Sequence, residues 1–300
     1  MKDGATSSRF ERYLERARRR VDRELGKLLP RASEEPRRLH EAIRYSVFAG
    51  GKRLRPALCL LACESISGSS RAALPSAAAL EMIHAFSLIH DDLPGMDDDD
   101  WRRGRRTNHK VFGEGIAILA GDALLALAFQ TLATRAAGKV GDPRALLRTV
   151  CEATGPRGMI GGQALDLLYE RKRVSFARVL GMHRRKTGML IRGSLLLGAQ
   201  VGGASPAQLR RFGAYGERIG VAFQIRDDLL NESSTRKATG KSVRSDRARG
   251  KATAPSSGGT ARSEAAMKRL LDQAARLAPG LGRRSAEFES LAEFLRHRSR

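Results

Sequence analysis

The stretch EMIHAFSLIHDDLPGMDDDDWRRGRRTNH, residues 81–109, decides how the rest of the chain is interpreted. An apolar run leads into six acidic residues within ten positions, and four arginines follow at once. Carboxylates this crowded repel one another unless a cation lies among them, and Mg²⁺ is typically bound by one or two carboxylates together with substrate phosphates. Arginine binds phosphate through a planar fork of donors. The stretch therefore predicts a diphosphate site assembled through Mg²⁺.

The composition favours helices. The 300 residues are 41% hydrophobic, rich in Ala, Leu and Arg, and poor in β-branched or aromatic runs, which is the balance typical of helical proteins. No segment alternates between apolar and polar residues as a half-buried strand does. The sequence therefore predicts an all-α fold in which one domain, residues 1–300, packs about ten or more helices around a central cavity.

Apolar periodicity and end signals place the individual helices. They are expected at 9–28, from after Ser33 to about Phe48, and at 56–66, 74–93, 114–137, 144–168, 173–202, 206–231, 261–277 and 285–298. Between the last long helix and the C-terminal pair, residues 232–259 are rich in Ser, Thr, Gly, Lys and Arg. A loop of this length is uncommon in a compact domain unless it has a function.

The formal net charge of +23 raises nucleic acid or an anionic membrane as partners. The basic residues are spread along the whole chain, however, and aromatic residues are only 5%, which is poor for stacking bases. Most of the charge is interpreted as a solvated surface, and no nucleic acid partner is expected. The hypothesis that the chain is a basic, helical nucleic-acid-binding protein stays open, but it rests on charge alone.

The chain is expected to be cytoplasmic. Its three cysteines, Cys59, Cys63 and Cys151, form no CxxC pair, which argues against a disulfide framework and against a zinc site. The N-terminus has no apolar leader segment. No run of eighteen uncharged apolar residues occurs, so no transmembrane helix is expected.

Two aspartate pairs end predominantly apolar helices. Asp91 and Asp92 end the helix expected at 74–93, and Asp227 and Asp228 lie near the end of the helix expected at 206–231. Unpaired carboxylates are costly to bury, so two such pairs are hard to explain as ordinary surface. Pro94-Gly95 ends the first helix and is expected to let Asp97 turn back toward the first pair.

The motifs occur together and in a specific order. DDLPGMDDDDWRRGRRTNH follows GGKRLRP at 50–56 and precedes GGQALDL at 161–167, KTG at 186–188 and FQIRDD at 223–228. This ensemble resembles the trans-prenyl diphosphate synthases, and most of all the short-chain bacterial farnesyl or geranylgeranyl diphosphate synthases. The resemblance covers the chain from about residue 10 to its end. It implies a homodimer of the class I isoprenoid synthase fold that condenses isopentenyl diphosphate with dimethylallyl or geranyl diphosphate.

The resemblance also implies roles for individual residues. Three Mg²⁺ ions would be held between the two aspartate-rich helix ends by Asp91, Asp92, Asp97, Asp227 and Asp228. The allylic diphosphate or its metals would be contacted by Arg102, Lys186, Thr187, Gln224, Lys241 and Lys251. The pocket for isopentenyl diphosphate would contain Lys52, Arg55, His84 and Arg103. Of these, the residues expected to carry catalysis are Asp91, Asp92, Asp97, Arg102, Lys186, Asp227 and Lys241.

Chain length and activity are predicted from three further features. Phe86, five positions before Asp91, matches the family position where a bulky aromatic limits the product, which favours farnesyl over geranylgeranyl diphosphate. Residues 232–259 resemble the flexible flap that closes over the diphosphates. The second motif ends in Asn231 where the family has an aspartate. This departure keeps open a weakly active subunit that binds diphosphates or a partner.

Overall fold

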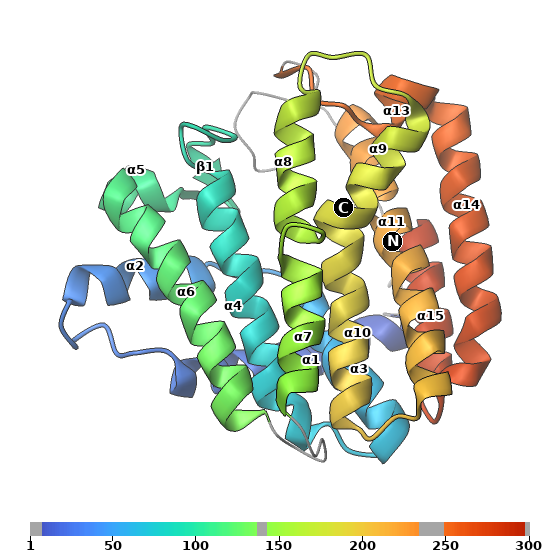
Figure 1. The fold of residues 1–300 in the computed structure, drawn as a ribbon, viewed down its shortest axis with the longest axis horizontal. Coiled ribbons are helices and arrows are strands. Elements are labelled where there is room, and N and C mark those ends of the chain that lie inside the picture. Colours follow the sequence, from blue (N-terminus) through green and yellow to red (C-terminus); the bar gives the residue numbers. More distant parts are fainter. Residues whose placement is uncertain (1–7, 137–142, 234–248, 298–300) are drawn as a thin grey trace, which may run out of the picture.

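The computed structural model describes residues 8–136, 143–233 and 249–297. These residues form fourteen α-helical segments and one pair of two-residue strands, which confirms the predicted all-α class and the predicted number of helices. The long helices run roughly side by side through the molecule (Figure 1).

The elements follow one another in two halves. The first half contains α1 (Arg9–Leu28), α2 (Arg37–Val47), α3 (Leu54–Ser67), a 3-10 turn (Arg71–Ala73), α4 (Leu74–Asp91), β1 (Trp101–Arg102), β2 (Arg105–Arg106), α5 (Asn108–Phe112) and α6 (Glu114–Arg135). The second half contains α7 (Pro143–Thr154), α8 (Met159–Tyr169), α9 (Phe176–His183), a π-helical turn (Arg184–Gly188), α10 (Met189–Val201), α11 (Pro206–Ser233), α13 (Ala254–Gly258), α14 (Thr260–Leu277), a 3-10 turn (Ala278–Leu281) and α15 (Ser285–His297).

Helix α4 lies inside the molecule, packed against α6, α3, α1, α2 and α10. Its side chains from Ala77 to Leu80 are fully buried, and so are Met82 and Ile83. A helix that is apolar on every side is stable only where other helices surround it. The second long helix of the site, α11, packs between α10 and α14. Helix α10 therefore contacts both aspartate-bearing helices, whose other neighbours differ.

Two predicted helices are each divided in the structure. The helix expected at 144–168 is α7 and α8, because Gly155-Pro156 forms a turn between them and proline cannot continue a helical hydrogen-bond ladder. The helix expected at 173–202 is α9 and α10, joined by the π-helical turn Arg184–Gly188. It also begins only after Ser175, whose backbone is extended.

Three smaller elements differ from the sequence prediction. Helix α2 begins at Arg37, a few residues late, because Pro36 precedes it in an extended conformation. The short helix α13 lies inside the segment predicted as a loop at 232–259, of which residues 234–248 lie outside the described residues. The β1–β2 hairpin was not predicted, and its two-residue turn places Arg103 and Gly104 at φ values of 53° and 75°, the arrangement of a type I′ turn.

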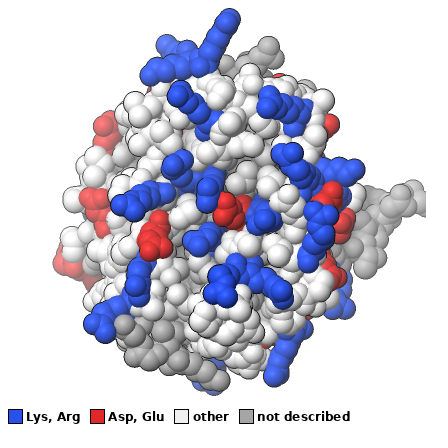
Figure 2. All heavy atoms as spheres, turned by 45° about the vertical axis from the view of Figure 1, so that its right-hand side comes forward, with Lys and Arg blue, Asp and Glu red and all other residues white. Residues whose placement is uncertain are grey.

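On one face of the molecule, the basic side chains are spread out as the sequence suggests. Lys and Arg are spread over the whole of the face drawn in Figure 2, with few Asp or Glu between them, and they do not gather into one band. This distribution fits a solvated basic surface.

Two helical segments are long and apolar enough to span a membrane by length and composition alone, Arg71–Asp91 and Glu114–Arg135. The sequence predicts no membrane-spanning helix because it has no long apolar run without a charged residue. These two segments are apolar on average but contain charged residues. In the first segment 67% of the most apolar window is buried inside the protein, so it is a core helix. In the second segment, α6, only 39% is buried.

Candidate active site

The ends of α4 and α11 face one cavity of about 900 Å³, which is also lined by α8 and the π-helical turn. Most of the residues that the sequence singles out meet here. From the predicted sets, the cavity is lined by Arg55, His84, Phe86, Asp91, Asp97, Arg102, Arg103, Lys186, Thr187, Gln224, Asp227, Asp228, Asn231 and Lys251. The predicted Lys241 lies outside the described residues.

The first aspartate-rich motif folds back on itself as predicted. After the turn at Pro94-Gly95, the backbone N–H of Asp97 donates a hydrogen bond of 2.7 Å to the carbonyl oxygen of Asp91. Burial raises the pKa of Asp91, and although Lys186 opposes this, the neighbouring carboxylate of Asp97 adds to it. Two carboxylates held together at a cavity wall are a donor set suited to a hard divalent cation.

Asp92 is not among the residues that line this cavity. It accepts hydrogen bonds from Arg102, with Nε at 2.7 Å and Nη2 at 2.6 Å from Oδ1. Burial raises the pKa of Asp92 to about 6 despite Arg102, and the negative charges of Asp99 and Asp91 contribute to the rise. Asp92 therefore positions Arg102, which itself lines the cavity.

Beside Asp97, two lysines share one carboxylate. Lys186 Nζ and Lys251 Nζ lie 2.7 Å and 2.9 Å from Asp166 Oδ2, and Lys251 Nζ also lies 2.6 Å from Asp97 Oδ1. Burial disfavours the ionised form of Asp166 and by itself would raise its pKa. The charges and hydrogen bonds of Lys186 and Lys251 outweigh burial and lower the pKa to about 2. The pKa of each lysine is raised against burial, with Asp166 the largest favourable cause. Both lysines are thus fully cationic at the cavity wall.

The π-helical turn explains how Lys186 reaches this position. The turn widens the helix between α9 and α10, and such turns are frequent at functional sites. It can lie close to α8 because position 162, the second glycine of GGQALDL, has no side chain. A Cβ on Gly162 would come within 2.1 Å of the backbone nitrogen of Lys186.

Arg249 adds a third cation. Its Nη1 lies 3.2 Å from Asp97 Oδ1 and its Nη2 lies 2.8 Å from Asp99 Oδ1. Burial works against the ionised form of Asp97, but Lys251, Lys186 and Arg249 together lower the pKa of this carboxyl. Arg249, which lies shortly before α13 in the chain, is therefore paired with the first aspartate-rich motif.

The two aspartates of α11 have different surroundings. Asp227 lines the cavity. Asp228 Oδ2 accepts hydrogen bonds of 2.8 Å from the backbone N–H of Ala254 and lies 2.8 Å from His183 Nε2, while its Oδ1 accepts from Gln224 Nε2 at 3.0 Å. Both oxygens of Asp228 are engaged, so this side chain connects α11, α9 and the start of α13.

A second cavity of about 380 Å³ brings together the four residues predicted for isopentenyl diphosphate, Lys52, Arg55, His84 and Arg103. The turn that carries Lys52 and Arg55 is fixed by Arg53, whose buried guanidinium pairs with Glu81 at 2.7 Å and with Asp22 at 2.8 Å.

The polar groups of this second cavity suit an anion. Burial and the nearby Arg55 and Arg103 lower the pKa of His84 well below its usual value, so the imidazole is neutral. Among the described residues, Arg55 Nε and His84 Nδ1 are buried without a hydrogen-bond partner, as is Gln163 Nε2 in the larger cavity. Buried donors without partners are costly, and a bound diphosphate supplies acceptor oxygens.

Phe86 lies on α4 at the wall of the large cavity and is 8% exposed. Its ring meets the ring of His90 edge-on, with 5.0 Å between the centroids. His90 Nε2 in turn lies 3.1 Å from the carbonyl oxygen of Ile118 on α6. The aromatic wall of the cavity is therefore supported from the neighbouring helix.

Sequence reasoning missed three residues of the site, Asp166, His183 and Arg249. Asp166 belongs to the quoted GGQALDL motif, so its position was available, but only the structure reveals the two lysines beside it. His183 precedes KTG by three residues. Arg249 is one of many basic residues in its segment, and no local signal distinguishes it.

The comparisons with known proteins agree with one another. The model of the polyprenyl synthetase family matches residues 36–283. A geranylgeranyl diphosphate synthase of Cyanophora paradoxa is 43% identical over 276 residues, which cover 91% of this chain and 91% of the relative. A farnesyl diphosphate synthase of Geobacillus stearothermophilus is 42% identical over 252 residues, 82% of this chain and 83% of the relative. The solved structure of a geranyltransferase from Helicobacter pylori complexed with magnesium and isoprenyl diphosphate matches with a TM-score of 0.80 and 27% identity over 97% of each chain.

Proposed function

The chain belongs to the polyprenyl synthetase family, and from that premise we propose that it condenses isopentenyl diphosphate with dimethylallyl or geranyl diphosphate to give farnesyl diphosphate. The observation that carries the proposal is the single cavity in which Asp91 and Asp97 of one motif face Asp227 of the other, with Lys186 at its wall. A diphosphate between them would meet both metal-binding carboxylates and fixed cations.

The residues of the large cavity suit ionisation of an allylic diphosphate. Asp91, Asp97 and Asp227 would hold Mg²⁺, which supplies Lewis-acid stabilisation of the leaving diphosphate. Lys186 and Arg102 add fixed positive charge where negative charge develops, an arrangement that lowers the barrier because the charges are already in position. The carbon–oxygen bond breaks, and the products are an allylic cation and pyrophosphate.

The smaller cavity suits the second substrate. Lys52, Arg55 and Arg103 would bind the diphosphate of isopentenyl diphosphate and direct its double bond toward the allylic cation. Holding two reactants in the right geometry removes much of the entropic barrier to their reaction. A carbon–carbon bond then forms, and the departing pyrophosphate accepts the proton released with formation of the new double bond. No dedicated protein base is required.

The product length is part of the proposal. Phe86 reduces the depth available to the growing chain below Asp91, which favours a fifteen-carbon product. Relatives of nearly equal identity carry farnesyl and geranylgeranyl names, so geranylgeranyl diphosphate is the alternative product.

A homodimer is also proposed, with α6 at its interface. Ile118 and Leu119 on this helix are 43% and 53% exposed. Together with Leu125 and Phe129, which are only partly buried, they give α6 an apolar side that the rest of the described chain leaves uncovered. A contiguous exposed apolar surface is typical of a protein–protein contact. Leu119→Arg should convert a dimer into a monomer in sedimentation analysis, and an unchanged mass would refute this interface.

One experiment tests the activity and the product together. The purified chain is incubated with Mg²⁺, isopentenyl diphosphate and either dimethylallyl or geranyl diphosphate, and the products are identified by mass spectrometry. Farnesyl diphosphate is expected, and Asp91→Asn combined with Asp97→Asn should abolish it. Asp272→Asn, a surface carboxylate paired with Arg296, is the matched control that should retain activity.

Asn231 favours the second candidate, a binding subunit with weak activity. It lines the cavity at the last position of the second motif, where it contributes an acceptor oxygen without a charge. If it limits the enzyme, Asn231→Asp should raise kcat. A folded protein that yields no product in any substrate combination would overturn the enzyme proposal in favour of this candidate.

A further inference from the structure

One side of the β1–β2 hairpin takes no part in the diphosphate site. Arg102 and Arg103 line the two cavities, but Trp101 lines neither of them and is 44% exposed. It is the only tryptophan of the chain. A single exposed apolar side chain is normal in a folded protein, so the groups around Trp101 decide whether its exposure has a meaning.

Around Trp101, arginine side chains are stacked on aromatic rings. The guanidinium carbon of Arg106 lies 5.4 Å from the centre of the Trp101 ring. That of Arg105 lies 4.3 Å from the centre of the Tyr45 ring on α2. Tyr45 meets Phe112 of α5 edge-on, with 5.4 Å between the ring centroids, and its hydroxyl donates a hydrogen bond of 2.7 Å to the carbonyl oxygen of Arg106. The hairpin, α2 and α5 therefore form one continuous surface.

Arg38 of α2 extends this row of stacked groups. Its guanidinium carbon lies 4.6 Å from the centre of the Phe112 ring, and its Nη2 donates a hydrogen bond of 2.9 Å to the carbonyl oxygen of Val111. Stacking on a ring covers the flat face of a guanidinium and leaves N–H groups at its edge, where they suit phosphate oxygens. We name the six stacked residues the aromatic–arginine surface: Arg38, Tyr45, Trp101, Arg105, Arg106 and Phe112.

Two arginines of the aromatic–arginine surface carry uncompensated charge. No carboxylate of the described residues forms an ion pair with Arg38 or Arg105. Glu41 is exposed one helical turn beyond Arg38, but the Arg38 side chain is directed to Phe112 and Val111 instead. The chain as a whole carries a formal charge of +23. An anion is therefore the complementary partner for this surface.

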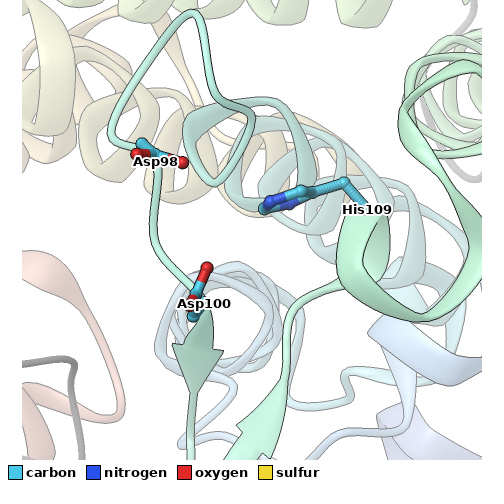
Figure 3. Close-up of side chains that lie close together, drawn as sticks. All are labelled: Asp98, Asp100 and His109. Atoms are coloured by element: carbon cyan, nitrogen blue, oxygen red, sulfur yellow. The ribbon is translucent and has the colours of Figure 1, made fainter.

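The four aspartates at 97–100, just before β1, do not cancel this charge. They alternate between two sides: the first and third pair with Arg249 at the large cavity, and the second and fourth lie beside His109 of α5. Figure 3 shows the imidazole ring of His109 directed toward their loop. Asp100 lies 2.9 Å from Lys110 Nζ and 3.9 Å from Arg106 Nη1. Its carboxylate therefore faces two cations at once and compensates only one of them.

We propose that the aromatic–arginine surface docks the protein, peripherally and reversibly, on bilayers of anionic phospholipid. Tryptophan and tyrosine favour the membrane–water interface, and arginines are attracted to anionic lipid headgroups. The choice of a lipid over another polyanion rests on the proposed function, because a prenyl diphosphate carries a long apolar tail that dissolves in a bilayer. The hairpin that would touch the lipid also carries Arg102 and Arg103 into the cavities. Docking here would therefore bring the site of product release close to the membrane.

The test mixes the full-length chain, without substrates or Mg²⁺, with vesicles of phosphatidylcholine alone or of phosphatidylcholine and phosphatidylglycerol. Because Trp101 is the only tryptophan, its fluorescence reports on this surface alone, and a blue shift is expected with the anionic vesicles only. In vesicle sedimentation, Arg38→Gln and Arg105→Gln should each weaken binding about fivefold, the equivalent of about 1 kcal/mol per arginine near an anionic membrane. Trp101→Ala should weaken it as well, and Glu41→Gln should strengthen it.

The matched control is Arg276→Gln, which removes the same charge from an exposed position of α14, on the opposite side of the molecule from the hairpin (Figure 1). It should leave vesicle binding unchanged. An equal loss in this control would show attraction by net charge alone and would overturn the proposal. So would an emission that does not shift, or one that a single-stranded oligonucleotide shifts equally. Because no substrate is present, vesicle binding and the prenyltransferase assay succeed or fail independently of each other.

Discussion

Asp166 is predicted to stabilise the protein as an ion shared by two lysines, and Asp166→Asn tests this directly. The carboxylate is 6% exposed and lies within 2.9 Å of Lys186 and Lys251. Its pKa falls from 3.8 to about 2 on folding. A difference of nearly two pKa units, each equivalent to about 1.4 kcal/mol, corresponds to roughly 2 kcal/mol of stability at pH 7. The variant should lose about that free energy of unfolding.

The pH dependence distinguishes this electrostatic contribution from a simple packing effect. Because the pKa is lower in the folded state, the stabilisation is complete above about pH 4 and is lost as the pH falls toward 2. Urea unfolding followed by circular dichroism should therefore show a gap between the two proteins that is constant from pH 7 to about 4 and narrows below it. Asp272→Asn, an exposed carboxylate with one arginine partner, serves as the control. A loss below about 0.5 kcal/mol at pH 7, the size expected of a surface substitution, would refute the reasoning, and so would a gap independent of pH.

Three further outcomes are expected. Mg²⁺ must displace Arg249 from Asp97, and a hydrogen bond between charged groups contributes about 1.5–3 kcal/mol. Arg249→Gln should therefore raise the affinity for Mg²⁺, measured without substrate, by about tenfold. Calorimetry that shows an unchanged Mg²⁺ affinity would contradict this. Phe86→Ala should lengthen the products seen by mass spectrometry, and an unaltered product spectrum would place the floor elsewhere. The pKa of Asp92 is raised to about 6, so below that pH Asp92 is protonated and Arg102 loses its anionic partner. We therefore expect kcat/KM to fall about tenfold per pH unit below about pH 6. The Asp92→Asn variant should be less active, and its kcat/KM should not show this fall at acidic pH.

The parts of the site that depend on local chain geometry could be predicted. Pro94-Gly95 indicates a turn, and the turn does return Asp97 to the carbonyl of Asp91. Helical spacing places Gln224, Asp227 and Asn231 on one side of α11, and all three line the cavity. Apolar periodicity predicted the positions of α1, α4, α6 and α11, but it did not reveal the breaks that divide the helices expected at 144–168 and 173–202.

The parts that depend on distant partners could not be predicted. Arg249 and Asp99 pair across 150 positions of the chain, and nothing in a run of basic residues indicates which of them reaches the cavity. Asp92 and Asp228 look equivalent to the aspartates beside them. Their oxygens are instead engaged by Arg102 and by His183 with the backbone of Ala254. The π-helical turn at Arg184–Gly188 lies between α9 and α10, where the sequence predicts one continuous helix.

The alternation along residues 97–100 limits how this segment can change in length. Asp97 and Asp99 face Arg249, while Asp98 and Asp100 face His109. Deleting a single aspartate would preserve an acidic run and nearly the same charge, yet it would exchange the side chains presented to the two faces. Deleting two would restore the order while shortening the segment. Which aspartate is presented to which face therefore matters more than the number of charges in the run. Deleting one aspartate should be tolerated less well than a single Asp→Asn change at position 98 or 100.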